Sequence, residues 1–322
     1  MSAVTSAREI SVLATGVVPH VTGLGHGFLL HDQPSGPITV DRDLATQVRA
    51  IAAAGPRRIT DDVMAQLPNL ELVANFGVGV DRVDVDAASR RGVIVTNTPD
   101  VLTEEVADFT LGLLISTVRR LVAADQFVRA GNWSASKVFP LSSSLRGRKV
   151  GIVGMGRIGE AVARRCAGMG LDISYYSRSQ KPGLPYAYQR SLLELASAVS
   201  VLIVVVPATP ETDKIINAEV ISALGPDGVL INVARGAVVD EEVLIDALTT
   251  GQLLAAGLDV FVGEPQLDPR FLTMSNVTLT PHIGSASLPT RQAMGDLVFA
   301  NVVSWFGGKG ALTPVNHAAV KS

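Results

Sequence analysis

The chain of 322 residues is long enough for two domains, each with its own core. Its 27 Lys and Arg residues nearly balance 30 Asp and Glu residues, so no excess of positive charge is available for nucleic acid or an anionic membrane. A single cysteine, Cys166, excludes an intrachain disulfide, a cysteine metal cluster and a CxxC redox pair, and it favours a reducing, cytoplasmic location. Only 18% of the residues are charged, which predicts extensive buried surface and a subunit interface.

An uncharged stretch near the N-terminus, residues 11–31, has the composition of a membrane span. Pro19, three histidines and four glycines make a spanning helix unfavourable there. The N-terminus also lacks the basic segment, apolar run and cleavage site of a signal peptide. The sequence therefore predicts a soluble protein.

Short apolar runs alternate with helical patterns along almost the whole chain, which is typical of an α/β fold around parallel sheets. The expected strands cover residues 10–17, 70–74, 93–96, 149–153, 173–176, 201–206, 229–233, 254–258 and 277–280. Helices are expected over residues 60–67, 104–124, 157–169 and 291–306. Turn-forming residues at 97–100 and 284–289 break the chain twice, which permits one domain to be inserted in the other.

A glycine-rich turn connects the expected strand at 149–153 to a helix, and its sequence is Gly154-Met155-Gly156-Arg157-Ile158-Gly159. In this context Gly154 permits the tight turn, Gly156 lets the backbone approach a pyrophosphate, and Gly159 allows close packing of the helix. The N-terminus of the helix stabilises the anion. The pattern predicts a dinucleotide site, and its alternatives are a turn without a ligand and a methyltransferase loop.

The next strand ends without the carboxylate that binds the ribose 2′-OH of NAD, because Ser177-Arg178-Ser179 stands at that position. A guanidinium flanked by hydroxyls can instead bind a 2′-phosphate through charge-assisted hydrogen bonds. We therefore expect NADPH as the cofactor, with NADH as a weaker alternative. The alternative interpretation is that Arg178 is an exposed loop residue without a ligand.

Three polar residues follow three consecutive expected strands, at the ends where open α/β sheets bind ligands. They are Arg235, Glu264 and His282. Reduction of a 2-keto acid needs a hydride donor, a proton donor and a cation for the carboxylate and the carbonyl. Arg235 can be the cation and His282 the proton donor, while Glu264 favours the protonated form of the histidine. Taken singly, each is equally compatible with a surface ion pair or a loop position.

Six segments in order resemble the motifs of the D-isomer-specific 2-hydroxyacid dehydrogenases over nearly the whole chain. They cover residues 75–84, 97–114, 147–159, 229–248, 257–265 and 281–287. The run from Ser177 to Ser179 is similar to that of NADPH-dependent glyoxylate and hydroxypyruvate reductases and of plant hydroxyphenylpyruvate reductases. The resemblance implies reduction of glyoxylate to glycolate and of hydroxypyruvate to D-glycerate.

The resemblance also implies two Rossmann-like or flavodoxin-like domains with parallel sheets, the cofactor domain being inserted into the substrate domain. Residues 1–101 and 287–322 would bind the substrate, and residues 102–286 would bind NAD(P). A homodimer is expected, formed through the helix near residues 104–124 and the arm that follows it. Phe139, in that arm, is a candidate for contact with the neighbouring active site.

By the same resemblance, His282 is the proton donor, Glu264 its partner and Arg235 the substrate anchor. The backbone N–H groups of Val78 and Gly79 would hold the substrate carboxylate. The further cofactor contacts would come from Val206, Pro207, Thr212, Val233, Ala234, Asp259 and Gly284, with Asp259 meeting the nicotinamide carboxamide. Ser285 could bind a substrate hydroxyl or cap the next helix. No metal is expected. A hydroxyphenylpyruvate reductase or another D-2-hydroxyacid dehydrogenase is one alternative, and a non-catalytic, dinucleotide-sensing corepressor-like protein is another.

Overall fold

The computed structural model describes residues 9–19, 27–33, 35–134 and 136–317. The chain divides into two compact units, of which unit 1 comprises Met1–Leu102 and Ser287–Ser322, and unit 2 comprises Thr103–Ala286. Each unit is built around a parallel sheet, and the sequence of unit 2 interrupts that of unit 1. The predicted α/β fold class is confirmed.

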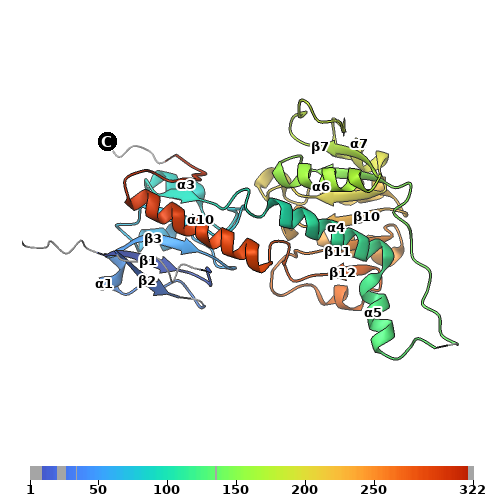
Figure 1. Ribbon diagram of the computed structural model, residues 1–322, viewed down its shortest axis with the longest axis horizontal. Coiled ribbons are helices and arrows are strands. Elements are labelled where there is room, and N and C mark those ends of the chain that lie inside the picture. Colours follow the sequence, from blue (N-terminus) through green and yellow to red (C-terminus); the bar gives the residue numbers. More distant parts are fainter. Residues whose placement is uncertain (1–8, 20–26, 34, 135, 318–322) are drawn as a thin grey trace, which may run out of the picture. The chain divides into compact units, whose positions relative to one another are not determined.

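Unit 1 has a five-stranded parallel sheet in the order β2-β1-β3-β4-β5. Its strands are β1 (Ile10–Ala14), β2 (Phe28–Asp32), β3 (Val48–Ala53), β4 (Leu72–Asn75) and β5 (Ile94–Thr96), and its helices are α1 (Arg42–Ala45), α2 (Asp61–Ala65), α3 (Val85–Arg90) and α10 (Leu288–Phe306). Alternate side chains of each strand face opposite sides of the sheet. Val298 and Val302 of α10, which crosses the sheet in Figure 1, therefore pack with Val12 on one side, while side chains of α2 and α3 pack on the other.

Unit 2 has a seven-stranded parallel sheet in the order β12-β11-β10-β9-β6-β7-β8. Its strands are β6 (Lys149–Val153), β7 (Asp172–Tyr176), β8 (Ala187–Tyr188), β9 (Val201–Val204), β10 (Val229–Asn232), β11 (Ala255–Leu258) and β12 (Val277–Leu279). From β6 the chain continues to β7 on one side and later to β9 on the other. This reversal creates a switch point, where open α/β sheets bind ligands beyond the carboxyl ends of their strands.

Helices cover both faces of the sheet of unit 2 (Figure 1). α4 (Thr103–Arg119) and α6 (Arg157–Gly168) pack on one face, and α7 (Leu192–Ala198), α8 (Ala218–Leu224) and α9 (Glu241–Thr250) pack on the other. The remaining elements are α5 (Leu121–Arg129) and the short 3₁₀ helices η2 (Pro210–Thr212), η3 (Gly236–Val238) and η4 (Pro269–Thr273). Cys166 is buried in α6, and burial raises the pKa of its thiol to about 11.

Two of the expected helices differ from the structure. The helix predicted over 104–124 is divided at Arg120, whose backbone is left-handed with φ of 53°, so α4 and α5 are separate. The last helix begins at Leu288, before the predicted residue 291, because Ser287 caps it and Pro289 fits its first turn.

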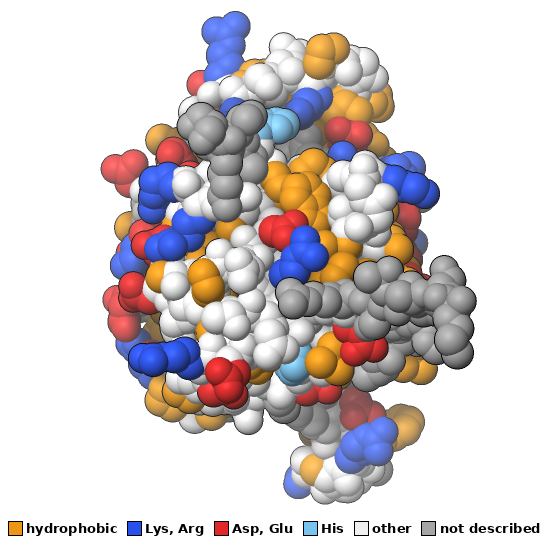
Figure 2. All heavy atoms as spheres, turned by 90° about the vertical axis from the view of Figure 1, so that its left-hand side faces the viewer, with side chains coloured by type: hydrophobic (Ala, Val, Ile, Leu, Met, Phe, Trp, Pro, Cys, Tyr) orange, Lys and Arg blue, Asp and Glu red, His pale blue; other side chains and the backbone are white. Residues whose placement is uncertain are grey.

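The uncharged stretch 11–31 contributes most of β1 and the larger part of β2, while residues 20–26 of it lie outside the described residues. Among the residues that the structure describes, no helix has the length and apolar character needed to cross a membrane. On the face shown in Figure 2, Lys and Arg side chains lie among Asp and Glu side chains rather than forming a continuous basic surface.

Candidate active site

The glycine-rich turn between β6 and α6 has the close contacts that its sequence predicts. Gly154 has φ of 102°, and a Cβ there would lie 2.8 Å from Cγ1 of Val206. A Cβ on Gly159 would lie 2.1 Å from the carbonyl oxygen of Gly154. Gly156 differs, because nothing lies within 4 Å of the position a Cβ would take. Space therefore remains beside the backbone where α6 begins, which fits a pyrophosphate bound by helix N–H groups.

The other residues of this turn have separate surroundings. The Met155 side chain is buried in the core of unit 2, so only its backbone is available to a ligand. Arg157 and Ile158 form the first turn of α6, whose capping residue Gly156 provides no side-chain hydrogen bond. No capping side chain covers this end of α6, and an uncapped helix N-terminus is suited to binding an anion.

The segment after β7 carries the residues expected to select the cofactor. The Ser177 hydroxyl donates to the carbonyl of Ser179 at 2.7 Å, which closes a tight turn around Arg178. The Arg178 side chain is exposed, and it makes no hydrogen bond or ion pair with the part of the chain that the structure describes. The pKa of Glu211 in η2 is lowered mainly by a hydrogen bond with Thr209 and in part by the charge of Arg178.

The segments after β9 and β10 lie beside the glycine-rich turn, since both strands end at the same edge of the sheet. The Thr212 hydroxyl donates to the carbonyl of Pro207 at 2.7 Å and holds the loop that follows Val206. After β10, the N–H of Val233 donates to the carbonyl of Val204, and the N–H of Ala234 donates to the side chain of Asn232. These expected cofactor contacts therefore gather at the switch point.

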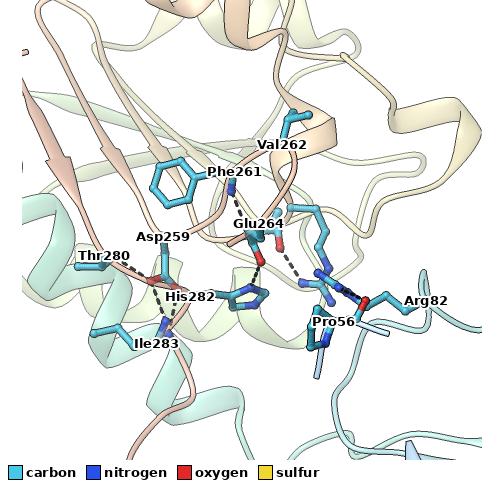
Figure 3. Close-up of polar contacts among 12 residues, drawn as sticks. Pro56, Arg82, Asp259, Phe261, Val262, Glu264, Thr280, His282 and Ile283 are labelled. Atoms are coloured by element: carbon cyan, nitrogen blue, oxygen red, sulfur yellow. Dashed lines mark hydrogen bonds and ion pairs between the residues drawn. The ribbon is translucent and has the colours of Figure 1, made fainter. Parts of the chain in front are cut away.

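The structure brings Glu264 and His282 together. Glu264 follows β11 and His282 follows β12, which are adjacent parallel strands. Glu264 Oε2 lies 2.8 Å from His282 Nδ1, and Glu264 Oε1 accepts a hydrogen bond from the N–H of Phe261 at 2.9 Å (Figure 3). The Glu264 side chain is 17% exposed and that of His282 is 41% exposed. The imidazole is thus oriented by a largely buried carboxylate and remains accessible.

Arg235 follows β10, the strand next to β11, and precedes η3. Its Nη1 donates to the carbonyl of Ala234 at 2.7 Å, and its own carbonyl accepts from the side chain of Asn232 at 3.0 Å. The next residue, Gly236, packs so closely that a Cβ would lie 2.0 Å from the carbonyl carbon of Phe261. The loop of Arg235 therefore lies directly against the loop that carries Glu264.

Asp259 has a role that sequence reasoning missed, because it fixes the segment that contains His282. Its Oδ1 accepts from the Thr280 hydroxyl at 2.7 Å and from the N–H of Ile283 at 2.8 Å, and Oδ2 accepts from the N–H of Gly284 at 2.8 Å (Figure 3). Burial raises the pKa of the Asp259 carboxyl, although these hydrogen bonds oppose the rise. Between these anchors His282 has a left-handed backbone, with φ of 55°. Asp259 is only 1% exposed and its side chain accepts three hydrogen bonds from its own chain, so its expected contact with a nicotinamide carboxamide stays a prediction.

In unit 1, Val78 and Gly79 lie in the loop that follows β4. The Asn75 amide donates to the carbonyls of Gly77 and Gly79 at 3.1 and 3.0 Å, and the Asn97 amide donates to that of Val78 at 2.9 Å. The N–H groups of Val78 and Gly79 donate to none of the described residues. Adjacent backbone N–H groups of this kind bind anions. Sequence reasoning missed Asn75 and Asn97, although both lie in the motifs at 75–84 and 97–114.

Ser287, rather than Ser285, caps α10 by accepting from the N–H of Thr290, so the capping role considered for Ser285 is wrong. Ser285 lies in the turn directly after Gly284. Phe139 packs within its own arm, with its ring centre 5.4 Å from that of Phe127 and 5.3 Å from the Arg120 guanidinium carbon. Over the described ranges, no group of three or more His, Cys, Asp or Glu side chains is placed to hold a metal ion.

Comparisons with known proteins agree with this geometry. The family model for the D-isomer specific 2-hydroxyacid dehydrogenase NAD binding domain matches residues 111–284. A hydroxyphenylpyruvate reductase of Plectranthus scutellarioides is 47% identical over 84% of this chain and 86% of its own, and a glyoxylate/hydroxypyruvate reductase of Arabidopsis thaliana is 44% identical over 83% and 85%. The crystal structure of an NADPH-dependent glyoxylate/hydroxypyruvate reductase from Sinorhizobium meliloti, in complex with NADP and malonate, has a TM-score of 0.91 and 48% identity, covering 95% of this chain and 96% of its own.

Proposed function

Because the chain belongs to the D-isomer-specific 2-hydroxyacid dehydrogenase family, we propose that it uses NADPH to reduce small 2-keto acids, glyoxylate to glycolate and hydroxypyruvate to D-glycerate. The observation that carries this proposal is the contact of 2.8 Å between His282 and Glu264, at the strand ends next to that of Arg235. A relative named for hydroxyphenylpyruvate is 47% identical to this chain, and one named for glyoxylate and hydroxypyruvate is 44% identical. A larger, hydroxyphenylpyruvate-type acid is therefore the alternative substrate, and a substrate assay distinguishes the two.

The residues of unit 2 fit the cofactor. The open backbone at Gly156 and the first N–H groups of α6 would hold the pyrophosphate, and the exposed guanidinium of Arg178 would hold the 2′-phosphate. Val206, Pro207 and Ala234 would line the remainder of the site at the switch point. When bound, NADPH supplies the hydride that reaches the carbonyl carbon.

The protein's own groups bind the keto acid and supply the proton. In unit 2, the planar Arg235 guanidinium would bind the carboxylate and polarise the carbonyl. His282 would donate a proton from Nε2 to the carbonyl oxygen, while Glu264 accepts from Nδ1–H and so fixes the tautomer. In unit 1, the N–H groups of Val78 and Gly79 would bind carboxylate oxygens. Ser285 is a candidate for contact with a substrate hydroxyl.

The two units would divide these tasks, so that residues 1–101 and 287–322 bind the substrate and residues 102–286 bind NADPH. A homodimer is supported by apolar side chains exposed on α5 and the arm after it: Leu121, Val122, Val128, Trp133, Val138 and Leu141. Apolar patches of this kind mark protein interfaces. The single cysteine supports a cytoplasmic location.

The test is a panel of 2-keto acids, each followed by loss of nicotinamide absorbance with NADPH and with NADH. We expect turnover with glyoxylate and hydroxypyruvate and higher kcat/KM with NADPH. A His282→Ala variant should lose about two to four decades of kcat while still binding NADPH, because general acid catalysis acts on the chemical step. Turnover of phenylpyruvate-type acids alone would reassign the substrate. Binding of NADPH without turnover of any keto acid would favour the alternative function, a non-catalytic, dinucleotide-sensing protein.

A further inference from the structure

The turn that carries Glu264 is held by a second carboxylate, that of Glu241 in the first turn of α9. Glu241 Oε1 accepts a hydrogen bond from the N–H of Val262 at 2.6 Å. The preceding N–H, that of Phe261, donates to Glu264 itself at 2.9 Å. Two consecutive N–H groups of one turn therefore donate to two different carboxylates, of which one contacts His282.

Two other parts of the turn are held in place: Phe261 is buried with its ring against Phe271, and the carbonyl of Gly263 accepts from the N–H of Gln266. Val262 is 50% exposed, so packing of its side chain does not fix it, and Gly263 adopts φ of 80°. The backbone of Gly236 packs against the turn, since a Cβ there would lie 2.3 Å from the nitrogen of Val262. The hydrogen bond from Val262 to Glu241 is a second constraint on the same peptide. The peptide between Phe261 and Val262 is thus held by packing and by a hydrogen bond.

The surroundings of Glu241 are costly for a negative charge. Burial raises the pKa of its carboxyl, and the charges of Asp268, Glu242 and Glu264 add to the rise, while the Val262 N–H opposes it. A half-buried acidic side chain kept near a like charge needs a compensating interaction. The hydrogen bond to the turn provides one, together with the N-terminus of α9.

We propose that Glu241 is a positioning residue for the acid/base pair: by accepting the N–H of Val262 it fixes the turn from Phe261 to Glu264, and so holds the Glu264 carboxylate against His282. The role in catalysis rests on the function proposed above. The positioning itself can be measured without substrate.

The chain offers a matched set of variants on one helical turn. Glu241→Ala removes the acceptor, and Glu241→Gln keeps an oxygen that can accept from Val262. Glu242→Ala is the control, because Glu242 is 69% exposed and contacts Arg270 at 2.6 Å, away from the turn. Thermal unfolding identifies the variants that remain folded, and hydrogen exchange measured by mass spectrometry follows the segment from 260 to 264.

In E241A we expect faster exchange of this segment, a fall of about tenfold in kcat for glyoxylate, and a KM for NADPH within about twofold of wild type. E241Q should restore most of the kcat, and E242A should match wild type. A stabilising role alone would lower the unfolding temperature without lowering the kcat of the folded protein.

Equal kcat values in E241A and E242A would overturn the proposal, as would E241Q being as impaired as E241A. If the wild-type protein turns over no keto acid, the proposed function fails, and hydrogen exchange alone decides the positioning. Exchange of the segment in E241A at the wild-type rate would then refute it.

Discussion

Replacing Asp259 by asparagine is expected to loosen the segment that carries His282, although the two side chains have nearly the same shape. The Asp259 carboxylate accepts from Thr280 and Ile283 on one oxygen and from Gly284 on the other. Asparagine offers one acceptor oxygen and one NH₂ donor. In either orientation the NH₂ faces at least one backbone N–H, so a buried donor loses its acceptor.

The magnitude follows from this loss. A buried, unsatisfied donor costs about 1–3 kcal/mol. His282 holds a left-handed backbone that itself costs about 1–2 kcal/mol, so the lost anchor is comparable with the strain it opposes. We therefore expect kcat for glyoxylate to fall about ten- to hundredfold, with the protein still folded.

The same substitution should change how stability depends on pH. Burial raises the folded-state pKa of Asp259, so its ionisation lowers the free energy of unfolding as the pH rises through that value. The asparagine variant should lack this dependence.

The measurements are kcat with glyoxylate at saturating NADPH and thermal unfolding across pH 4–8. Thr280→Val is the matched control, because it removes one hydroxyl donor from Asp259 and leaves both backbone donors paired. Its cost should stay below about 1 kcal/mol. A wild-type kcat in Asp259→Asn, or equal losses in the two variants, would show that Asp259 does not hold the His282 segment.

Three further predictions concern the proposed contacts. Arg178→Ala should lower kcat/KM for NADPH about ten- to hundredfold and change that for NADH little, and equal losses would remove its role as the 2′-phosphate ligand. Glu264→Gln should lower kcat for glyoxylate by less than His282→Ala does, because the amide oxygen can still accept from the imidazole, and a wild-type kcat would show that Glu264 does not orient His282 for catalysis. Arg235→Lys should lose more kcat/KM for glyoxylate than for a simple aldehyde, whereas similar losses would argue against carboxylate recognition.

The parts of the fold that were predicted are those whose signals are local. Apolar strands of unit 2, such as β9 and β10, and the glycine-rich turn are continuous in sequence. Strands β2, β3 and β8 were not predicted, because β2 is a partly exposed edge strand ending in His31 and Asp32, three of the six residues of β3 are alanine, and β8 has only two residues. The separation of α4 from α5 was missed because one left-handed residue, Arg120, leaves the apolar periodicity intact.

The candidate site likewise has parts that local sequence signals predict and parts that they do not. Spacing along the chain predicts that Arg235, Glu264 and His282 follow neighbouring strands, because parallel strands end at one edge of a sheet. The residues that hold the site loops in place were missed, since Asp259 and Asn75 bind backbone groups whose positions depend on the folded loops. A carboxylate or amide in a sequence does not indicate which N–H or carbonyl it will bind.

Close packing between the loop of Arg235 and the loop of Glu264 explains why Arg235 is followed by glycine. A side chain at position 236 would displace the peptide between Phe261 and Val262, because even a Cβ would lie 2.0 Å from the Phe261 carbonyl carbon. That displacement would move Glu264, whose Oε1 is tied to the N–H of Phe261. The anchor loop and the acid/base loop are therefore coupled through backbone packing. A change in either loop acts on both functions, so effects of substitutions in the two loops are not expected to be additive.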